Sequence, residues 1–194
     1  MKTIFMPGCG VKRDYQDELK ITMDYLKEHF EDVELYEACC KMDVEKPKAD
    51  TFIYSCFGCY PRMEAINTAK NYYSIYEIFD KYGLPAEAKQ ENKNVVVGIH
   101  ECSKLKDDQK NKDLLRKIVK QLGYQIEEAQ VITEEHDKCA KVLVASNGEK
   151  GIEVLESQLA NYKSDTIVTM CKGCKANFDK TSKNGTHLFE LIFK

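Results

Sequence analysis

The sequence predicts an α/β protein made of two pseudo-repeated strand–helix halves, each with a short parallel sheet flanked by helices. Three observations lead to this fold class. Strand-like apolar runs alternate with segments whose apolar residues recur at helical spacing, called helical stripes below. Five features occur twice in the same order, and a polar segment separates the first occurrence from the second. That segment, residues 84–94, contains a proline and few apolar side chains. We therefore expect one cysteine-rich half at 1–90 and a second at 91–194.

Each half opens with a short apolar run, at residues 3–6 and 95–99, that ends shortly before a cysteine. Such runs predict buried strands. A helical stripe follows in each half: Leu19, Met23, Leu26 and Phe30 in the first, and Leu115, Ile118, Val119 and Leu122 in the second. Residues at this spacing normally face a core. Alternation of strand and helix favours parallel strands with helices packed on them.

The remaining features also recur. Each half has a middle cysteine element, then a strand that ends at a Cys-x-x-Cys, then a short helix with an aromatic–Glu–aliphatic step. The strands are expected at 52–55 and 167–170, and the steps lie at 76–78 and 189–191. Five features in one order indicate a duplication. The second half also carries an additional helical stripe, with Ile152, Leu155, Leu159 and Tyr162.

The composition indicates a soluble protein with a substantial core. Of the 194 residues, 43% are hydrophobic and 31% are charged, and the net charge is −3. A nucleic-acid-binding protein would show a basic patch or a high pI, so this function is not expected. No apolar run reaches the roughly 18 residues of a membrane-spanning helix. The apolar stretch before Pro7 is too short for a signal peptide, which predicts a cytoplasmic location.

Cysteine is the unusual residue, with nine copies. An odd number cannot all pair within one chain, and a reducing compartment disfavours disulfides. Metal or cluster binding would protect these thiols from oxidation. All nine fall within the repeated plan and are the predicted cofactor-binding and metal-binding residues: Cys9, Cys39, Cys40, Cys56, Cys59, Cys102, Cys139, Cys171 and Cys174.

The spacing gives a physical reason for this prediction. A Cys-x-x-Cys at the start of a helix directs two sulfur atoms the same way, and a helix N-terminus lowers the pKa of a thiol. Gly58 and Gly173 allow a tight turn between the paired cysteines. Parallel strands end at one edge of a sheet, which brings the first cysteine of each half to the same place. Four or five sulfur atoms are thus expected to converge in each half.

Three segments resemble the cysteine-rich CCG domain family, whose domain occurs twice in a subunit of heterodisulfide reductase. They are Pro7-Gly8-Cys9, the Ile-Val-Thr-x-Cys-x-x-Cys segment at 167–174, and the His-x-x-Glu-Leu step at 187–191. The resemblance implies noncubane [4Fe-4S] clusters that split a disulfide between small thiol cofactors. One cluster would be held by Cys9, Cys39, Cys40, Cys56 and Cys59. The other would be held by Cys102, Cys139, Cys171 and Cys174.

The chain departs from the family pattern at the middle cysteines. Lys41 and Ala140 stand beside them in place of the family's glycine, and Ala140 also replaces the fifth cysteine of the second half. The four-thiolate site is therefore compatible with a cubane cluster, a modified cluster or a zinc ion. Neither a ferredoxin-type cysteine motif nor a Gly-x-Gly-x-x-Gly is present. A flavoprotein or ferredoxin-like partner would have to supply electrons.

The function predicted from this resemblance is a 4Fe-4S iron–sulfur oxidoreductase subunit of heterodisulfide-reductase type, acting on thiol or disulfide substrates. Two alternatives remain: a non-catalytic electron-transfer module, and a zinc-binding structural or assembly protein. No catalytic residue is assigned. His100 and His136 are candidates for an additional ligand or a proton donor, against the alternative of histidines that only lie beside the site.

Overall fold

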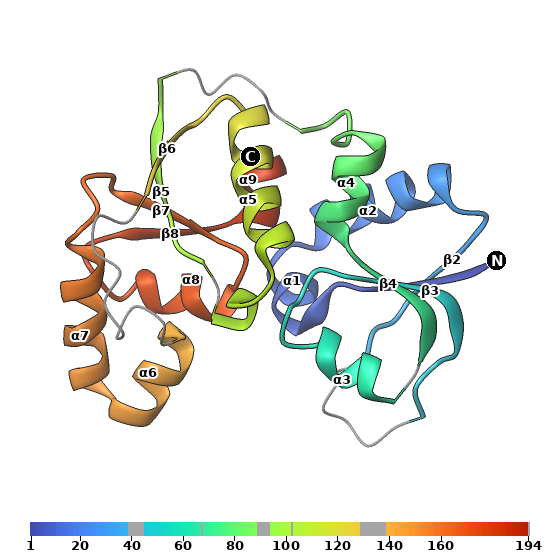
Figure 1. Cartoon of the computed structure of the whole chain (residues 1–194), viewed down its shortest axis with the longest axis horizontal. Coiled ribbons are helices and arrows are strands. Elements are labelled where there is room, and N and C mark those ends of the chain that lie inside the picture. Colours follow the sequence, from blue (N-terminus) through green and yellow to red (C-terminus); the bar gives the residue numbers. More distant parts are fainter. Residues whose placement is uncertain (39–44, 67, 89–93, 102, 129–138, 194) are drawn as a thin grey trace. The chain divides into compact units, whose positions relative to one another are not determined.

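The computed structural model describes residues 1–38, 45–66, 68–88, 94–101, 103–128 and 139–193 (Figure 1). The chain forms two compact units, Met1–Ala88 and Lys89–Lys194, called unit 1 and unit 2 below. Each has its own sheet and its own buried side chains. The boundary expected from the sequence, between residues 90 and 91, lies two residues from the division between the units.

Unit 1 is built on a parallel sheet whose strand order is β2-β1-β3-β4. Its elements are β1 (Lys2–Met6), α1 (Gly8–Asp14), α2 (Gln16–His29), β2 (Asp32–Leu35), β3 (Ala49–Tyr54), α3 (Tyr60–Ala65), β4 (Ala69–Ser74) and α4 (Ile75–Tyr82). The two inner strands are buried over most of their length, whereas β2 alternates between exposed and half-buried residues. This difference is expected between the centre and the edge of a sheet.

Unit 2 repeats that topology, with a parallel sheet in the order β6-β5-β7-β8. Its elements are β5 (Val96–Ile99), the 3₁₀ helix η1 (Ser103–Leu105), α5 (Gln109–Gln121), β6 (Gln125–Glu127), α6 (Ala140–Asn147), α7 (Glu149–Leu159), β7 (Thr166–Thr169), α8 (Lys172–Phe178), β8 (Asn184–His187) and α9 (Leu188–Phe193). In both units the first strand pairs with the second and third, and the third also pairs with the fourth. The predicted fold class, an α/β fold of two repeated halves with parallel sheets flanked by helices, is therefore confirmed.

The edge strands β2, β4, β6 and β8 were not predicted as strands. Three of them are short, with four residues in β2 and β8 and three in β6, whereas β4 has six. Their sequences also lack the continuous apolar runs of β1 and β5, because an edge strand is covered less completely. The apolar residues that predicted the second helix begin at Leu115, but α5 begins at Gln109, where the Asp108 side chain accepts a hydrogen bond from the backbone N–H of Asn111 at 3.1 Å.

Unit 2 contains two helices between its second and third strands, where the described residues of unit 1 contain none. These helices, α6 and α7, pack against each other and against α8. Gly151 permits this close approach: a Cβ on this glycine would lie 2.6 Å from the carbonyl oxygen of Leu143. The α6–α7 pair is therefore the main architectural difference between the units, and it carries one of the predicted ligands, Cys139, at its start.

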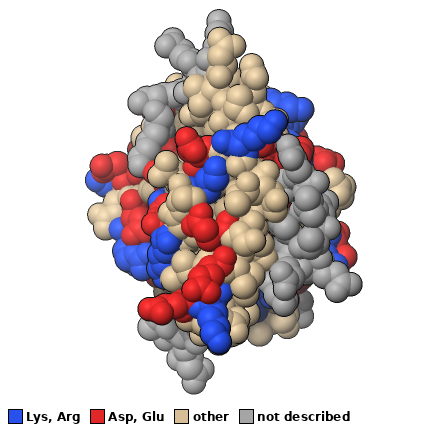
Figure 2. Space-filling view, turned by 90° about the vertical axis from the view of Figure 1, so that its left-hand side faces the viewer, with Lys and Arg blue, Asp and Glu red and all other residues tan. Residues whose placement is uncertain are grey.

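No helix among the described residues is both long enough and apolar enough to cross a membrane. Figure 2 shows one face of the molecule, on which basic and acidic side chains are intermingled with uncharged ones. A mixture of both signs is typical of a solvated protein surface.

Candidate metal centre

The two Cys-x-x-Cys motifs form the same kind of turn in both units. In unit 2 the Cys171 carbonyl oxygen accepts hydrogen bonds from the backbone N–H groups of Cys174 and Lys175, both at 3.0 Å. In unit 1 the Cys56 carbonyl oxygen accepts from Cys59 and Tyr60, at 2.9 and 3.3 Å. Each motif thus begins a helix at the end of the third strand, as its spacing predicts.

Three thiols converge in unit 2. The Sγ atoms of Cys139, Cys171 and Cys174 all lie within 4.8 Å of one another. Those of Cys139 and Cys174 are 4.0 Å apart, although the two residues are 35 positions apart in the sequence. Histidine, cysteine, aspartate and glutamate are the usual metal ligands. Among the described residues of these types, the three cysteines are the set whose ligand atoms lie close enough together to hold a metal ion.

Two helices, α6 and α8, place the three sulfur atoms. Cys139 is the N-cap of α6, Cys171 is the N-cap of α8, and Cys174 lies in the first turn of α8. Cys171 is also held by a hydrogen bond from its backbone N–H to Thr169 Oγ1, at 3.3 Å. Packing of α6 against α8 then brings Cys139 to the Cys-x-x-Cys turn.

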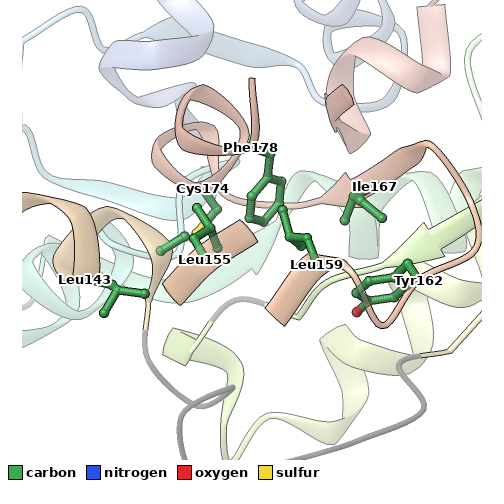
Figure 3. Close-up of a cluster of buried hydrophobic side chains, with 8 residues drawn as sticks. Leu143, Leu155, Leu159, Tyr162, Ile167, Cys174 and Phe178 are labelled. Atoms are coloured by element: carbon green, nitrogen blue, oxygen red, sulfur yellow. The ribbon is translucent and has the colours of Figure 1, made fainter. Parts of the chain in front are cut away.

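The group lies at the edge of the unit 2 core. Cys174 is completely buried, whereas Cys139 and Cys171 are half-buried. Figure 3 shows Cys174 among the apolar side chains of α6, α7 and α8, with Leu155 beside it. One sulfur atom therefore faces the core and two are partly accessible to solvent.

The glycine within the turn is required by a neighbouring lysine. A Cβ on Gly173 would lie 2.7 Å from Cδ of Lys141 and 3.2 Å from its Cβ. The aliphatic part of Lys141 therefore packs on the turn. Gly173 does not have a positive φ, so the tight-turn reason for this glycine was wrong. The same correction applies to Gly58, which also lacks a positive φ.

The surroundings of Cys174 disfavour ionisation of its thiol. Hydrogen bonds with Cys139 and Cys171, followed by burial, hold the pKa of the Cys174 thiol well above its usual range. Neighbouring thiolates repel one another, so a negative charge on Cys174 is unfavourable. A bound divalent cation reverses this effect because it stabilises every thiolate that it contacts.

His187, the last residue of β8, supports the turn that begins at Cys171. Burial lowers its pKa to about 4, so the imidazole is neutral at neutral pH. Its Nδ1 accepts a hydrogen bond from the backbone N–H of Phe189 at 3.2 Å, and the side chain also bonds with the backbone of Met170. Met170 immediately precedes Cys171, so the buried imidazole helps to fix the end of β7.

Among the predicted histidine ligands, His100 is buried, and its ring lies edge-on to Phe178 with centroids 4.9 Å apart. It is not part of the three-thiol group. His136 lies outside the described residues, as do Cys39, Cys40 and Cys102.

The predicted ligands of unit 1 are placed near the carboxyl ends of β1 and β3. Cys9 is exposed in α1, Cys56 is half-buried after β3, and Cys59 is buried at the start of α3. The backbone at Gly8 packs closely against Cys56: a Cβ on Gly8 would lie only 2.6 Å from the Cβ of Cys56. Within the described part of unit 1, however, these three do not form a group with ligand atoms as close as those of unit 2.

Sequence reasoning missed the residues that support the unit 2 site, namely Thr169, Lys141 and Phe178. Thr169 could have been found, because a threonine two residues before a turn commonly bonds to the backbone there. The contribution of Lys141 depends on how α6 packs on α8, for which the sequence offers no local signal.

No protein-family model and no curated protein matches the chain. The solved structures that match include an aspartate racemase homologue from Pyrococcus horikoshii OT3, with 13% identity, a TM-score of 0.40, and coverage of 100% of this chain and 96% of that chain. They also include the Picrophilus torridus aspartate racemase, with 11% identity, a TM-score of 0.42, and coverage of 100% and 91%. A putative Asp/Glu racemase from Yersinia pestis matches with 9% identity, a TM-score of 0.39, and coverage of 100% and 96%.

These comparisons correct the predicted family. The matching structures are of aspartate and glutamate racemases, not of CCG domains or heterodisulfide reductase, and no family model supports the resemblance. The assignment to the CCG family is therefore wrong, because a similar order of cysteines can arise in unrelated proteins. TM-scores below 0.5 reflect only a general likeness, and a shared fold does not establish a shared activity.

The predicted activity is corrected with the family. The prediction of an iron–sulfur oxidoreductase subunit of heterodisulfide-reductase type was wrong, and the matching structures support neither the electron-transfer module nor the zinc-binding structural or assembly protein better. The predicted cofactor, an iron–sulfur cluster or zinc, stays a prediction.

Proposed function

We propose that unit 2 binds a single zinc ion through the Sγ atoms of Cys139, Cys171 and Cys174. A zinc–thiolate distance of about 2.3 Å and tetrahedral angles place two coordinating sulfur atoms about 3.8 Å apart. The 4.0 Å between the sulfur atoms of Cys139 and Cys174 is close to this value. This spacing, in a set of one thiol at the start of α6 and two at the start of α8, is the observation that carries the proposal.

Thiolate ligands also favour zinc chemically. Soft sulfur ligands select zinc and copper(I) over magnesium and calcium, which prefer oxygen. The group contains three thiols and no carboxylate. When bound, zinc would supply positive charge beside the Cys174 thiol, whose pKa is raised by hydrogen bonds with Cys139 and Cys171 and by burial. It would also connect the start of α6 to the start of α8.

The sequence suggests Cys102 as the fourth ligand. β5 pairs with β7 so that Ile99 is opposite Val168. Cys171 follows Val168 by three residues, and Cys102 follows Ile99 by the same number. Cys102 itself lies outside the described residues. Four thiolates would complete the closed, tetrahedral coordination that structural zinc sites normally have.

A cobalt(II) titration tests this proposal, because tetrahedral cobalt–thiolate complexes absorb strongly in the visible range. We expect the metal-free, reduced full chain to bind one cobalt ion and to release it when zinc is added. Cys171→Ser and Cys174→Ser should each weaken zinc binding by more than about 100-fold, because each removes one coordinating thiolate. Cys102→Ser should weaken it similarly.

The matched control is Cys59→Ser, which alters the second cysteine of the unit 1 motif. We expect it to leave the zinc affinity of unit 2 unchanged. Cobalt binding that survives in Cys174→Ser would contradict the proposal. Purification of the chain with iron and acid-labile sulfide, and without zinc, would also contradict it.

The same titration should depend on pH. The raised pKa of Cys174 means that metal binding must displace a proton from this thiol at neutral pH. Binding therefore releases protons, and the affinity for zinc must fall as the pH falls. Isothermal titration calorimetry at pH 6, 7 and 8 is expected to show an apparent Kd that rises at least about tenfold for each unit of decreasing pH. A Kd independent of pH would show that the thiols are already ionised.

We also propose that the protein works in a reducing compartment such as the cytoplasm. The six described cysteines are all in the thiol form. Thiols are needed for metal binding, and they persist where glutathione and thioredoxin keep the environment reducing. Fractionation of cells followed by trapping of reactive thiols with an alkylating reagent would test this location.

A further inference from the structure

Two of the three thiols, Cys139 and Cys174, are already in contact. Their Sγ atoms are 4.0 Å apart, and α6 and α8, at whose starts they lie, pack against each other. A disulfide requires a sulfur–sulfur distance of about 2.0 Å. Closing the pair therefore needs the two sulfur atoms to approach by about 2 Å.

We infer that Cys139 and Cys174 form an intramolecular disulfide when unit 2 meets a peroxide, and that this reaction expels the zinc. The expulsion rests on the proposed function, whereas formation of the disulfide depends only on the geometry of the thiols. A disulfide leaves two fewer thiolates for the metal, and thiolates are the form that binds zinc.

The difference in burial assigns a role to each cysteine. Cys139 is a half-buried residue, as is Cys171, whereas Cys174 is completely buried. A cysteine that is exposed to the oxidant and lies next to a protected second thiol has the arrangement of a redox-sensitive pair. Cys139 is therefore the residue that reacts first, and Cys174 is the residue that resolves it.

Cys171 is a less suitable partner for the same reaction. Its backbone N–H bonds to Thr169 Oγ1, and its carbonyl oxygen accepts two hydrogen bonds within the turn. These contacts fix its backbone on both sides. The backbone of Cys139 is held through its carbonyl oxygen, which accepts a hydrogen bond from the backbone N–H of Leu143 at 2.9 Å. The choice of Cys139 as the partner of Cys174 rests on the 4.0 Å between their sulfur atoms.

The chemistry balances in two steps. The Cys139 thiolate attacks one oxygen of hydrogen peroxide, so that an S–O bond forms, the O–O bond breaks and hydroxide leaves. The Cys174 thiol then attacks the Cys139 sulfur atom, an S–S bond forms and the S–O bond breaks, and the departing hydroxide takes the proton of the Cys174 thiol and leaves as water. The two sulfur atoms lose two electrons, and the peroxide gains them. A proton from the solvent converts the first hydroxide to water.

Trypsin makes the test direct, because each of the three cysteines lies in a different tryptic peptide. Lys138 and Lys141 flank Cys139, Lys172 separates Cys171 from Cys174, and Lys175 follows Cys174. The zinc-loaded full chain would be treated with one equivalent of hydrogen peroxide, alkylated, digested and analysed by mass spectrometry without reduction. A chromophoric chelator would measure the released zinc.

We expect a crosslink between the peptides 139–141 and 173–175, with about one zinc ion released for each crosslink formed. Dithiothreitol should reverse the crosslink and restore zinc binding. Cys139→Ser should abolish the crosslink. Cys9→Ser removes an exposed cysteine of unit 1 and should leave the crosslink unchanged. A crosslink between peptides 164–172 and 173–175, or sulfinic acid at Cys139 without any crosslink, would overturn the inference.

The same experiment on metal-free protein separates this inference from the proposed function. A chain that binds no zinc but forms the Cys139–Cys174 crosslink would refute the zinc site and support the redox pair. A chain that binds zinc through these thiols, but yields no Cys139–Cys174 crosslink with peroxide, would support the zinc site and refute the redox pair.

Discussion

Replacing Phe178 with alanine is expected to lower the free energy of unfolding of unit 2 by about 3–5 kcal/mol. Phe178 ends α8, is completely buried, and belongs to the apolar cluster that includes Leu155, Leu159 and Cys174 (Figure 3). Its ring also contacts the edge of His100. Truncation would remove buried apolar area and leave a cavity that the surrounding helices cannot fill completely.

Unfolding in urea, followed by circular dichroism with a metal chelator present, would measure this loss. Bound zinc must be removed because it would add its own contribution to stability. Val142→Ala is the control, since Val142 lies on α6 and is 59% exposed. This substitution should change the free energy of unfolding by no more than about 0.5 kcal/mol. A comparable loss for both variants would show that Phe178 is not part of a tightly packed core.

Replacing Gly8 with alanine is expected to destabilise unit 1 by about 2–4 kcal/mol. Gly8 has a φ of +78°, which is unfavourable for any residue with a Cβ. A Cβ there would also lie 2.6 Å from the Cβ of Cys56, so the turn after β1 and the turn after β3 would have to separate. Strain and steric overlap therefore act together at this position.

Gly83→Ala isolates the first of these two effects. Gly83 has a φ of +95°, but a Cβ there would have nothing within 4 Å. We expect a loss of about 1–2 kcal/mol, from backbone strain alone. The difference between the two variants, measured by urea unfolding or by hydrogen exchange in β1 and β3, gives the cost of the close approach to Cys56. Equal losses would show that the two turns can separate freely.

Much of the fold was predictable because local patterns and tertiary structure agree. The apolar runs before Cys9 and Cys102 became β1 and β5, and the helical stripes became α2 and α5. Both Cys-x-x-Cys motifs begin helices at the ends of buried strands. Period and composition report burial directly, so buried strands and amphipathic helices leave a readable signal.

The edge strands and the convergence of thiols depend on contacts that no local pattern records. β8 is recognisable as a strand only through its pairing with β7, which places His187 opposite Thr169 and behind the Cys171 turn. The unit 2 site needs the α6–α7 pair, since packing of α6 on α8 brings Cys139 to Cys174. Cysteine order predicted that a site exists, whereas the distances between sulfur atoms show which thiols lie close together.

The sequence by itself determined the repeated α/β plan, the strand–turn–helix setting of each Cys-x-x-Cys, and the choice of thiols as candidate ligands. Only the tertiary structure decided which thiols meet, how deeply Cys174 is buried, and why Gly8 and Gly173 must lack a side chain. The physical reason is that residue type and periodicity depend on near neighbours. Sulfur–sulfur distances and steric limits depend instead on the packing of helices and turns that are far apart in the sequence.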